Sequence, residues 1–429
     1  MKLTALAAVL MLIAFGEVRL NPDQRPVEIE SPAPAGSAQP HLADAYDGGV
    51  ILSWLERSGT GHRFRFAIRR DGRWTEPVTI AEGDRFFANW ADVPSVVRLP
   101  DGSIIAHWLQ VSGPGKYAYD VMLRHSRDEG RTWSSPLIPH GDGTQTEHGF
   151  VSIVSWPGST FGDRFGVVWL DGRDFAKHGG GHGEAGMKAE MSLRATVPSQ
   201  MVGGSISGSG AASPPVSVWT LGEDMLVDSR VCECCPTAAA RTSRGVIVAY
   251  RDRSPGEVRD IAVTRFEGGR WTDGKVVHAD NWQIPGCPVN GPALAASGSR
   301  VALAWFAAPE NNARVSVAFS NDAGVTFGAP IRVDDGLPLG RVALATLDDA
   351  SALVGWLEYV KDPTGRGGSS AEFRMRRVST GGARGDAMTV ARVTSERASG
   401  YPRLARSGDV VTFAWVAGDR VKVASMTLR

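Results

Sequence analysis

The sequence predicts an all-β protein in which four-stranded blades form a β-propeller. Three observations predict it: a turn-rich and tryptophan-rich composition, a strand pattern that recurs seven times, and a last repeat that lacks one strand. The chain of 429 residues contains 51 Gly, 25 Pro and 13 Trp. This composition is typical of many short strands that are joined by tight turns.

The recurring unit consists of a strand that begins near P-x-L-A, a turn, an apolar strand that ends in an aromatic residue, and a third strand. The seven aromatic residues that mark the units are Trp54, Trp108, Trp169, Tyr250, Trp305, Trp356 and Trp415. Self-similar units of this size indicate a repeat architecture. Because a radial array of four-stranded units closes into a ring and protects its sheet edges, we predict a β-propeller with seven blades, with six as the alternative.

The last repeat, "YPRLARSGDVVTFAWVAGDRVKVASMTLR", ends after its third strand. The fourth strands of other repeats read "EPVTI", "SPLIP" and "APIRV", and residues 25–30 read "RPVEIE". The similarity predicts that this N-terminal segment supplies the missing outer strand of the last blade. The ring would then be closed by both ends of the chain.

The first residues, "MKLTALAAVLMLIAFGEV", have the pattern of an export signal, with Lys2 before an apolar run and small residues where cleavage occurs. We expect residues 1–16 to be a signal peptide, residues 17–37 a linker that includes the closing strand 25–30, and residues 38–429 the propeller. No stretch is long enough for a membrane span. These features predict a periplasmic or secreted monomer without a membrane span.

The charges of the chain balance, with 46 Lys plus Arg and 46 Asp plus Glu. A neutral chain has no overall field that attracts nucleic acid. We therefore exclude nucleic acid as a partner and expect a small molecule, a glycan or a metal ion as the ligand.

Two repeats carry the same turn motif, S-x-D-x-G-x-T-[WF], as "SRDEGRTW" and "SNDAGVTF". The Asp accepts backbone N–H bonds across a hairpin turn, the Gly supplies a positive φ, and the aromatic residue packs on the neighbouring strand. The residues to which the motif assigns this structural role are Ser126, Asp128, Gly130, Trp133, Ser320, Asp322, Gly324 and Phe327.

This motif resembles the Asp-box, or BNR repeat, of the sialidase superfamily, and the resemblance covers nearly the whole chain after the signal peptide. It implies a β-propeller, although sialidases have six blades. The Asp-boxes themselves are structural, so they imply a fold and no chemistry.

The resemblance also implies what a sialidase site would need: three arginines for a carboxylate, a Tyr–Glu nucleophile pair and an Asp acid/base, with the first arginine in an R-I-P motif. That motif is missing, because "WQIPGC" and "PLIPHG" contain no Arg before I-P. Whether the chain is an enzyme therefore stays open at the sequence level. The residues that could take catalytic roles at strand ends are Arg173, Asp174, Arg251, Asp252, Arg253 and Asp92.

The four cysteines are concentrated in two loops, "RVCECCP" and "PGCPVNG", which lead into neighbouring blades on one face. Three interpretations follow: an inter-blade disulfide, a thiolate site for a soft metal such as copper or zinc, or a nucleophilic cysteine. We expect the two loops to meet near the axis of the ring. The candidate metal ligands are Cys232, Cys234, Cys235, Cys287 and His148, with His41 as a further supplement.

Two functions follow from these observations. The first is an exported sialidase-like propeller that binds a ligand or a soft metal at its axial face through the Cys-rich loop. The second is a glycoside hydrolase of the sialidase type, which cleaves terminal sugars from glycoconjugates. Because the R-I-P arginine is missing and the cysteine loop occupies the axial face, the sequence favours the binding module.

Overall fold

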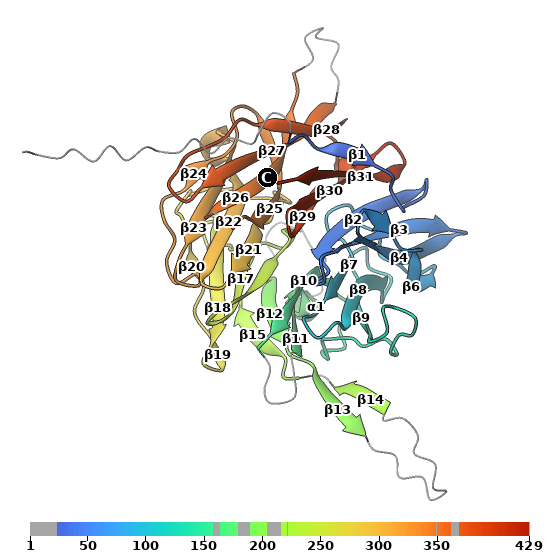
Figure 1. The fold of residues 1–429 in the computed structure, drawn as a ribbon. Helices are drawn as coiled ribbons and strands as arrows, with labels where there is room; N and C mark the ends of the chain where they lie inside the picture. Colours follow the sequence, from blue (N-terminus) through green and yellow to red (C-terminus); the bar gives the residue numbers. More distant parts are fainter. Residues whose placement is uncertain are drawn as a thin grey trace, which may run out of the picture.

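A computed structural model describes residues 24–157, 164–178, 189–203, 216–220, 222–348, 350–361 and 369–428. These residues form a seven-bladed β-propeller (Figure 1). Each blade is an antiparallel sheet whose first strand lies nearest the axis, and the chain passes around the ring from blue to red. The prediction of seven blades is confirmed, and the alternative of six is excluded by the number of sheets.

The first three blades occupy the N-terminal half of the ring. Blade one contains β2 (Ser37–Asp44), β3 (Val50–Ser58), β4 (Gly61–Arg70), β5 (Arg73–Trp74) and β6 (Val78–Gly83). Blade two contains β7 (Ser95–Arg98), β8 (Ile104–Val111) and β9 (Tyr119–Ser126), with one bridge from Leu123 to Leu137 at the place of an outer strand. Blade three contains β10 (His148–Trp156), β11 (Arg164–Asp171), β12 (Ser192–Thr196) and β15 (Met225–Asp228), and a separate hairpin of β13 (Ser199–Gly203) and β14 (Val216–Thr220) extends from it.

The remaining four blades complete the ring. Blade four contains β16 (Ala238–Thr242), β17 (Gly245–Arg251), β18 (Ile261–Glu267), β19 (Arg270–Trp271) and β20 (Lys275–Val276). Blade five contains β21 (Ala293–Ser297), β22 (Arg300–Ala307), β23 (Arg314–Ser320) and β24 (Ile331–Arg332). Blade six contains β25 (Pro338–Thr346), β26 (Ser351–Tyr359), β27 (Ser370–Ser379) and β28 (Met388–Thr394). Blade seven contains β29 (Arg403–Ser407), β30 (Val410–Ala417), β31 (Arg420–Thr427) and β1 (Val27–Ile29).

The described part of the chain contains few helices, and they are short: α1 (Arg173–His178) and the 3₁₀ turns η1 (Pro309–Asn311) and η2 (Arg397–Ser399). Within the described ranges, none has the length and apolarity that crossing a bilayer requires. The expected signal peptide, residues 1–16, lies outside the described residues.

The N-terminal strand closes the ring as predicted. Strand β1 pairs antiparallel with β31, with Glu28 opposite Ala424, and it lies beside the C-terminal strand in Figure 1. Glu28 also forms an ion pair with Lys422 at 2.7 Å, and Ile29 packs against the core between blades. The outer edge of β31 is thereby covered, which removes an exposed template for strand addition.

The repeated aromatic residues are the centres of the blade cores. Trp54, Trp169, Trp305 and Trp356 are at most 1% exposed. In three blades the indole N–H donates to the carboxylate two residues later, at 2.5 to 3.0 Å; the pairs are Trp54 with Glu56, Trp169 with Asp171, and Trp356 with Glu358. The repeat W-L-[DE] thus buries a large ring and satisfies its one polar atom.

The two Asp-box turns have the same hydrogen bonds. In blade two, the Asp128 carboxylate accepts the Thr132 N–H at 2.9 Å and the Thr132 hydroxyl at 2.6 Å, and Ser126 Oγ accepts the Gly130 N–H at 2.8 Å. The matching bonds in blade five join Asp322 with Thr326, and Ser320 with Gly324. The turn is therefore held by side chains of its own motif, as the sequence indicates.

Glycine is required in the second of these turns. Gly324 has a φ of +81°, and a Cβ atom there would lie 2.2 Å from Ile247 Cδ1 in the preceding blade. The turn thus needs both a left-handed backbone and the absence of a side chain. In the first turn the aromatic residue Trp133 packs edge-on against Phe66 of blade one, with ring centroids 6.1 Å apart. Asp-boxes therefore connect neighbouring blades.

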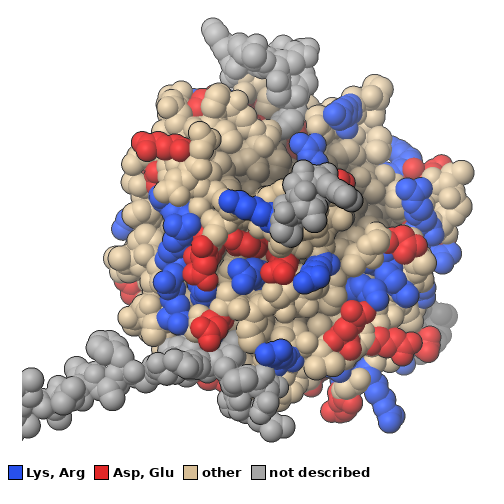
Figure 2. All heavy atoms as spheres, turned by 90° about the horizontal axis from the view of Figure 1, so that it is seen from above, with Lys and Arg blue, Asp and Glu red and all other residues tan. Residues whose placement is uncertain are grey.

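Charges of both signs are interspersed on the face shown in Figure 2. That face carries no large patch of one sign in its described part. The surface agrees with the balanced composition of 46 basic and 46 acidic residues.

Candidate functional site: an axial cavity and a thiol cluster

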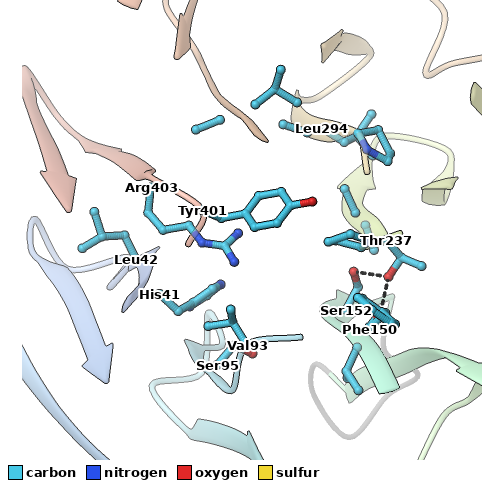
Figure 3. A pocket seen from close by; sticks show the side chains of 18 of the residues that line it. His41, Leu42, Val93, Ser95, Phe150, Ser152, Thr237, Leu294, Tyr401 and Arg403 are labelled. Carbon is cyan, nitrogen blue, oxygen red and sulfur yellow. Dashed lines mark hydrogen bonds between the residues drawn. The ribbon is translucent and has the colours of Figure 1, made fainter. Parts of the chain in front are cut away.

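The first strands of the seven blades, with the loops before them, surround an axial cavity of about 240 Å³. Its side chains with polar groups are His41, Asp92, Ser95, Ser152, Thr237, Tyr401 and Arg403. Figure 3 shows the Arg403 guanidinium and the His41 ring side by side and directed toward the middle of the cavity. On the opposite wall, Thr237 donates to the Phe150 carbonyl and bonds with Ser152, both at 2.8 Å.

The cavity has a positive charge that no nearby acid neutralises. Arg403 donates to the Pro40 carbonyl at 3.3 Å, and within the described ranges no carboxylate lies within ion-pair distance of it. Burial lowers the pKa of Arg403 to about 10, so its guanidinium stays charged at pH 7. Burial and the nearby Arg403 charge hold the pKa of His41 well below its usual value, so this ring is neutral.

The one carboxyl in the cavity wall, Asp92, belongs to a buried group with Tyr119 and Glu147. The Tyr119 hydroxyl lies 3.0 Å from Asp92 Oδ2 and 2.8 Å from Glu147 Oε1. The Phe150 N–H donates to Asp92 at 2.8 Å. Burial, with the charge of Glu147, raises the pKa of Asp92 to about 8, so Asp92 holds its proton at pH 7.

This proton makes stability depend on pH. The pKa of Asp92 rises from near 4 in the unfolded chain to about 8 in the fold. Its contribution to folding is therefore fully present below pH 4 and is lost as the pH rises through 8. We expect Asp92→Asn, which keeps the shape and carries no charge, to melt at a higher temperature than wild type at pH 9 and to show a smaller advantage at pH 5. Thermal melts at both pH values measure this, with the exposed Asp71→Asn as the control. A difference in melting temperature between Asp92→Asn and wild type that did not grow from pH 5 to pH 9 would contradict the prediction.

The six candidate catalytic residues do not converge in the structure. Of these, only Asp92 lines the axial cavity. Arg173, the first residue of α1, forms ion pairs with Asp142, Asp171 and Asp224 at 2.7 to 3.0 Å. The adjacent Asp174 accepts the Glu190 N–H at 3.1 Å.

Arg251 has a structural role. It is 1% exposed, and its guanidinium donates to the backbone carbonyls of Asn290, Arg259 and Phe306 at 2.6 to 2.8 Å. Because all three guanidinium nitrogens bond to the main chain of two blades and the side chain is buried, Arg251 does not reach a substrate in the cavity. It instead connects blade four to blade five.

Asp252 and Arg253 lie in the loop that follows β17. Asp252 Oδ1 accepts the Arg253 N–H at 2.8 Å. The Arg253 guanidinium forms ion pairs with Glu257, at 2.7 Å, and with Glu233. Among the described residues, Arg403 is the arginine that lines the cavity, and Arg173, Arg251 and Arg253 all bond elsewhere.

Three cysteines form a compact thiol cluster, defined here as the sulfur atoms of Cys232, Cys234 and Cys235. These atoms all lie within 4.8 Å of one another, with 2.8 Å between Cys232 and Cys235 and 3.9 Å between Cys232 and Cys234. The three side chains are at most 7% exposed. The cluster immediately precedes Pro236 in the cavity wall, so it lies at the axial face.

The loop that carries the cluster is anchored at both its backbone and its side chains. The Cys232 N–H donates to the Arg251 carbonyl at 3.0 Å. The Glu233 carboxylate, between the cysteines in the chain, accepts a hydrogen bond from the Arg259 guanidinium at 2.6 Å. The same Arg259 lies 3.3 Å from Cys232 Sγ. The cluster is therefore held rigidly beside a cation.

The charge on the cluster is concentrated at Cys232. Burial opposes ionisation, but hydrogen bonds from Cys234 and Cys235 and the positive charge of Arg259 lower the pKa of the Cys232 thiol well below its usual value. Hydrogen bonding to Cys232 raises the pKa of Cys234, and burial raises that of Cys235. The arrangement favours one thiolate that accepts hydrogen bonds from two thiols.

The fourth cysteine, Cys287, comes from the loop before blade five and is exposed. Its side chain is close enough to Cys234 to contribute, after Cys232 and Cys235, to the raised pKa of that thiol, so the two cysteine loops meet as the topology predicts. The inter-blade disulfide considered from the sequence is absent, since all four cysteines are thiols in the structure.

His148, a candidate metal ligand, belongs to another cluster. Its ring nitrogens bond to Asp142 at 3.0 Å and to the Tyr119 carbonyl at 3.3 Å, and the ring stacks on His140 at 3.8 Å. Although burial opposes it, the bond to Asp142 and the charge of Asp171 raise the pKa of His148. Both nitrogens are engaged, so His148 is not available to the thiol cluster.

Among the arginines that the sequence offers as partners for a carboxylate, Arg403 does face the cavity, whereas Arg259 binds the cysteine loop. Sequence reasoning missed Tyr119, the first residue of β9, and its pairing with Glu147, which directly precedes β10. Only the spacing C-x-x-C within "CECC", from Cys232 to Cys235, was a usable signal for the closest sulfur pair.

No family model matches the chain, and neither does any curated protein. Among solved structures, the chain is similar to the Hadza microbial sialidase Hz136, with 17% identity, a TM-score of 0.41 and coverage of 75% of this chain and 63% of that one. It is also similar to a PL25 ulvan lyase, with 16% identity, a TM-score of 0.44 and coverage of 82% of this chain and 80% of that one. It is similar as well to polysaccharide lyase Uly1, with 10% identity, a TM-score of 0.49 and coverage of 95% of this chain and 92% of that one. At identities of this size the likeness concerns the fold alone.

Proposed function

We propose that the protein binds one soft, thiophilic metal ion, Cu(I) or Zn(II), at the thiol cluster on the axial face of the propeller. The observation that carries the proposal is the position of three sulfur atoms from one loop within 4.8 Å of one another. Thiolate sulfur is the ligand that selects Cu(I) and Zn(II) over hard cations. Cys287, which helps to raise the pKa of Cys234 and so lies near it, is the candidate for a fourth sulfur ligand.

The surroundings of the cluster suit a thiolate centre. Ligand thiols lose their protons when a metal binds, so the site must tolerate negative charge away from water. Arg259 contacts Cys232 Sγ at 3.3 Å, and the charge of Arg251 acts on Cys235. Two buried guanidinium groups thus balance the charge of a sulfur-rich complex.

The two metals differ in the number of sulfurs they require. Structural Zn(II) sites are tetrahedral and would use all four cysteines. A Cu(I) ion would need only the three sulfurs of the cluster. The variant Cys287→Ser therefore distinguishes the two metals. We expect it to weaken Zn(II) binding and to leave Cu(I) affinity close to that of wild type.

The test is an anaerobic titration of reduced, metal-free protein with Zn(II) and, separately, with Cu(I), each in competition with a chromophoric chelator. We expect one ion per chain for at least one of the two metals. Failure of both metals to bind against a chelator of micromolar affinity would reject the proposal.

A second candidate function rests on Arg403. This guanidinium faces the axial cavity without a carboxylate partner in the described part of the chain, beside a neutral His41 and a protonated Asp92. A guanidinium in such a position pairs well with a carboxylate. We propose that the cavity binds a small acidic sugar, such as a uronic or sialic acid.

We expect binding of that sugar without efficient hydrolysis. The Tyr119 hydroxyl contacts two carboxyl groups, and burial together with the charge of Glu147 holds its pKa well above the usual value, which disfavours the phenolate nucleophile. A fluorogenic sialoside should therefore show little turnover, while glucuronate or sialate should bind by calorimetry and lose at least about 10-fold in affinity in Arg403→Gln. Cys287→Ser should bind the acid as wild type does. Fast sialoside turnover, abolished in Arg403→Gln, would instead support a sialidase.

We also propose that the protein is exported to the periplasm or secreted, because residues 1–16 have the pattern of a signal peptide. Cell fractionation and N-terminal sequencing of the expressed full chain test this. Retention of an intact N-terminus in the cytoplasm would contradict it.

A further inference from the structure

We propose that the four cysteines form a thiol–disulfide relay, in which Cys287 exchanges with an external disulfide and the oxidation ends as a reversible bond between Cys232 and Cys235. This activity is distinct from the proposed metal binding and does not require a metal. It uses the same sulfurs and is expected only when no ion occupies them.

The order of the relay follows from exposure and contact. Cys287 is exposed, whereas Cys234 is 7% exposed and Cys232 and Cys235 are 1% exposed. The loop of Cys287 meets the cysteine loop beside Cys234, where it helps to raise the pKa of that thiol, and Cys234 Sγ lies 3.9 Å from Cys232 Sγ. An external disulfide can therefore reach only the first of these sulfurs, and each later sulfur is adjacent to the one before it.

The final pair is set by distance and sequence spacing. Cys232 Sγ and Cys235 Sγ lie 2.8 Å apart, the shortest separation in the thiol cluster. They stand at the ends of C-x-x-C, the spacing at which a short loop can close a disulfide and open it again. The product would lie within one loop and would differ from an inter-blade disulfide.

Each step is a thiol–disulfide exchange with balanced atoms. The Cys287 thiolate attacks R–S–S–R, forms a mixed disulfide and releases RS⁻. Cys234 then attacks the Cys287 sulfur and releases the second RS⁻. Cys232 next attacks the Cys234 sulfur and frees Cys287, and finally Cys235 attacks Cys232 and frees Cys234. In total, one external disulfide is reduced to two thiols, which take the two protons of Cys232 and Cys235.

The test uses the reduced full chain with a metal chelator present and oxidised glutathione as the probe. Free thiols are blocked with one alkylating reagent, disulfides are reduced and labelled with a second, and the tryptic peptides 231–241 and 276–300 are analysed by mass spectrometry. We expect the second label on Cys232 and Cys235 and the first on Cys234 and Cys287. Because a chelator is present, the outcome does not depend on metal binding.

Two variants test the order of transfer. Cys287→Ser, at an exposed position, should slow oxidation of the buried pair by at least about 10-fold, since the three remaining sulfurs are shielded. Cys234→Ser should leave glutathione attached to Cys287. The proposal is overturned if wild type keeps a stable glutathione adduct on Cys287 while the cluster stays reduced, if Cys234–Cys287 is the final bond, or if Cys287→Ser is oxidised as fast as wild type.

Discussion

Deletion of residues 24–30 is expected to lower the free energy of unfolding by about 3 kcal/mol. The deletion removes β1, whose three residues pair with Val423 to Ser425 of β31, and it also removes the packing of Ile29 against the blade core. A few net hydrogen bonds of about 1 kcal/mol each and one partly buried aliphatic side chain account for this magnitude. The measurement is chemical denaturation of purified protein, followed by tryptophan fluorescence.

The deletion has a second, qualitative consequence. Without β1, the outer edge of β31 would be unpaired and open to strand addition, so the variant should also associate at high concentration. Val27→Thr, at a side chain that is 64% exposed, is the matched control and should change stability by less than about 0.5 kcal/mol. A deletion as stable as this control would show that the ring does not depend on its N-terminal strand.

The largest effect on binding is expected from Cys232→Ser, which should reduce Cu(I) affinity at least about 100-fold. Cys232 is the cluster sulfur closest to Cys235 and the one that Arg259 contacts, so its loss removes both a ligand and the site of the charge. Competition with a Cu(I)-specific chelator under anaerobic conditions measures the change.

His41→Gln is the control for that substitution. His41 lines the axial cavity beside Arg403, and its Nδ1 atom makes no hydrogen bond among the described residues. The variant should keep Cu(I) affinity within about 3-fold of wild type, because the proposed site uses sulfur ligands alone. Equal losses in Cys232→Ser and His41→Gln would place the ion in the cavity and not on the cluster.

The fold could be predicted because its signals are local and repeated. The aromatic residue at the end of each second strand, such as Trp169 or Trp356, marks a blade core, and the turn motif around Asp128 and Asp322 needs only neighbouring residues. The closing strand was also predictable, because residues 25–30 repeat the pattern of the outer strands. In blade two, where the pattern "SPLIP" suggested a strand, the structure forms only the single bridge at Leu137.

The candidate site was predictable only in part, because its determining contacts join distant segments. The meeting of the two cysteine loops followed from topology, but the redox state of the sulfurs did not follow from their spacing. The bonds of Arg251 to the Phe306 carbonyl and of His148 to the Tyr119 carbonyl each join two blades. That Arg403 has no carboxylate partner among the described residues is recognised only when its surroundings are known.

The most direct test of the metal proposal is X-ray absorption at the metal edge of protein that is loaded with one equivalent of Cu(I). The thiol cluster predicts a first coordination shell of three sulfur atoms from Cys232, Cys234 and Cys235, with no imidazole nitrogen. Loss of sulfur scattering in Cys235→Ser should accompany the loss of affinity. A shell that is dominated by nitrogen or oxygen, or a spectrum unchanged by Cys235→Ser, would contradict the assignment of the cluster as the metal site.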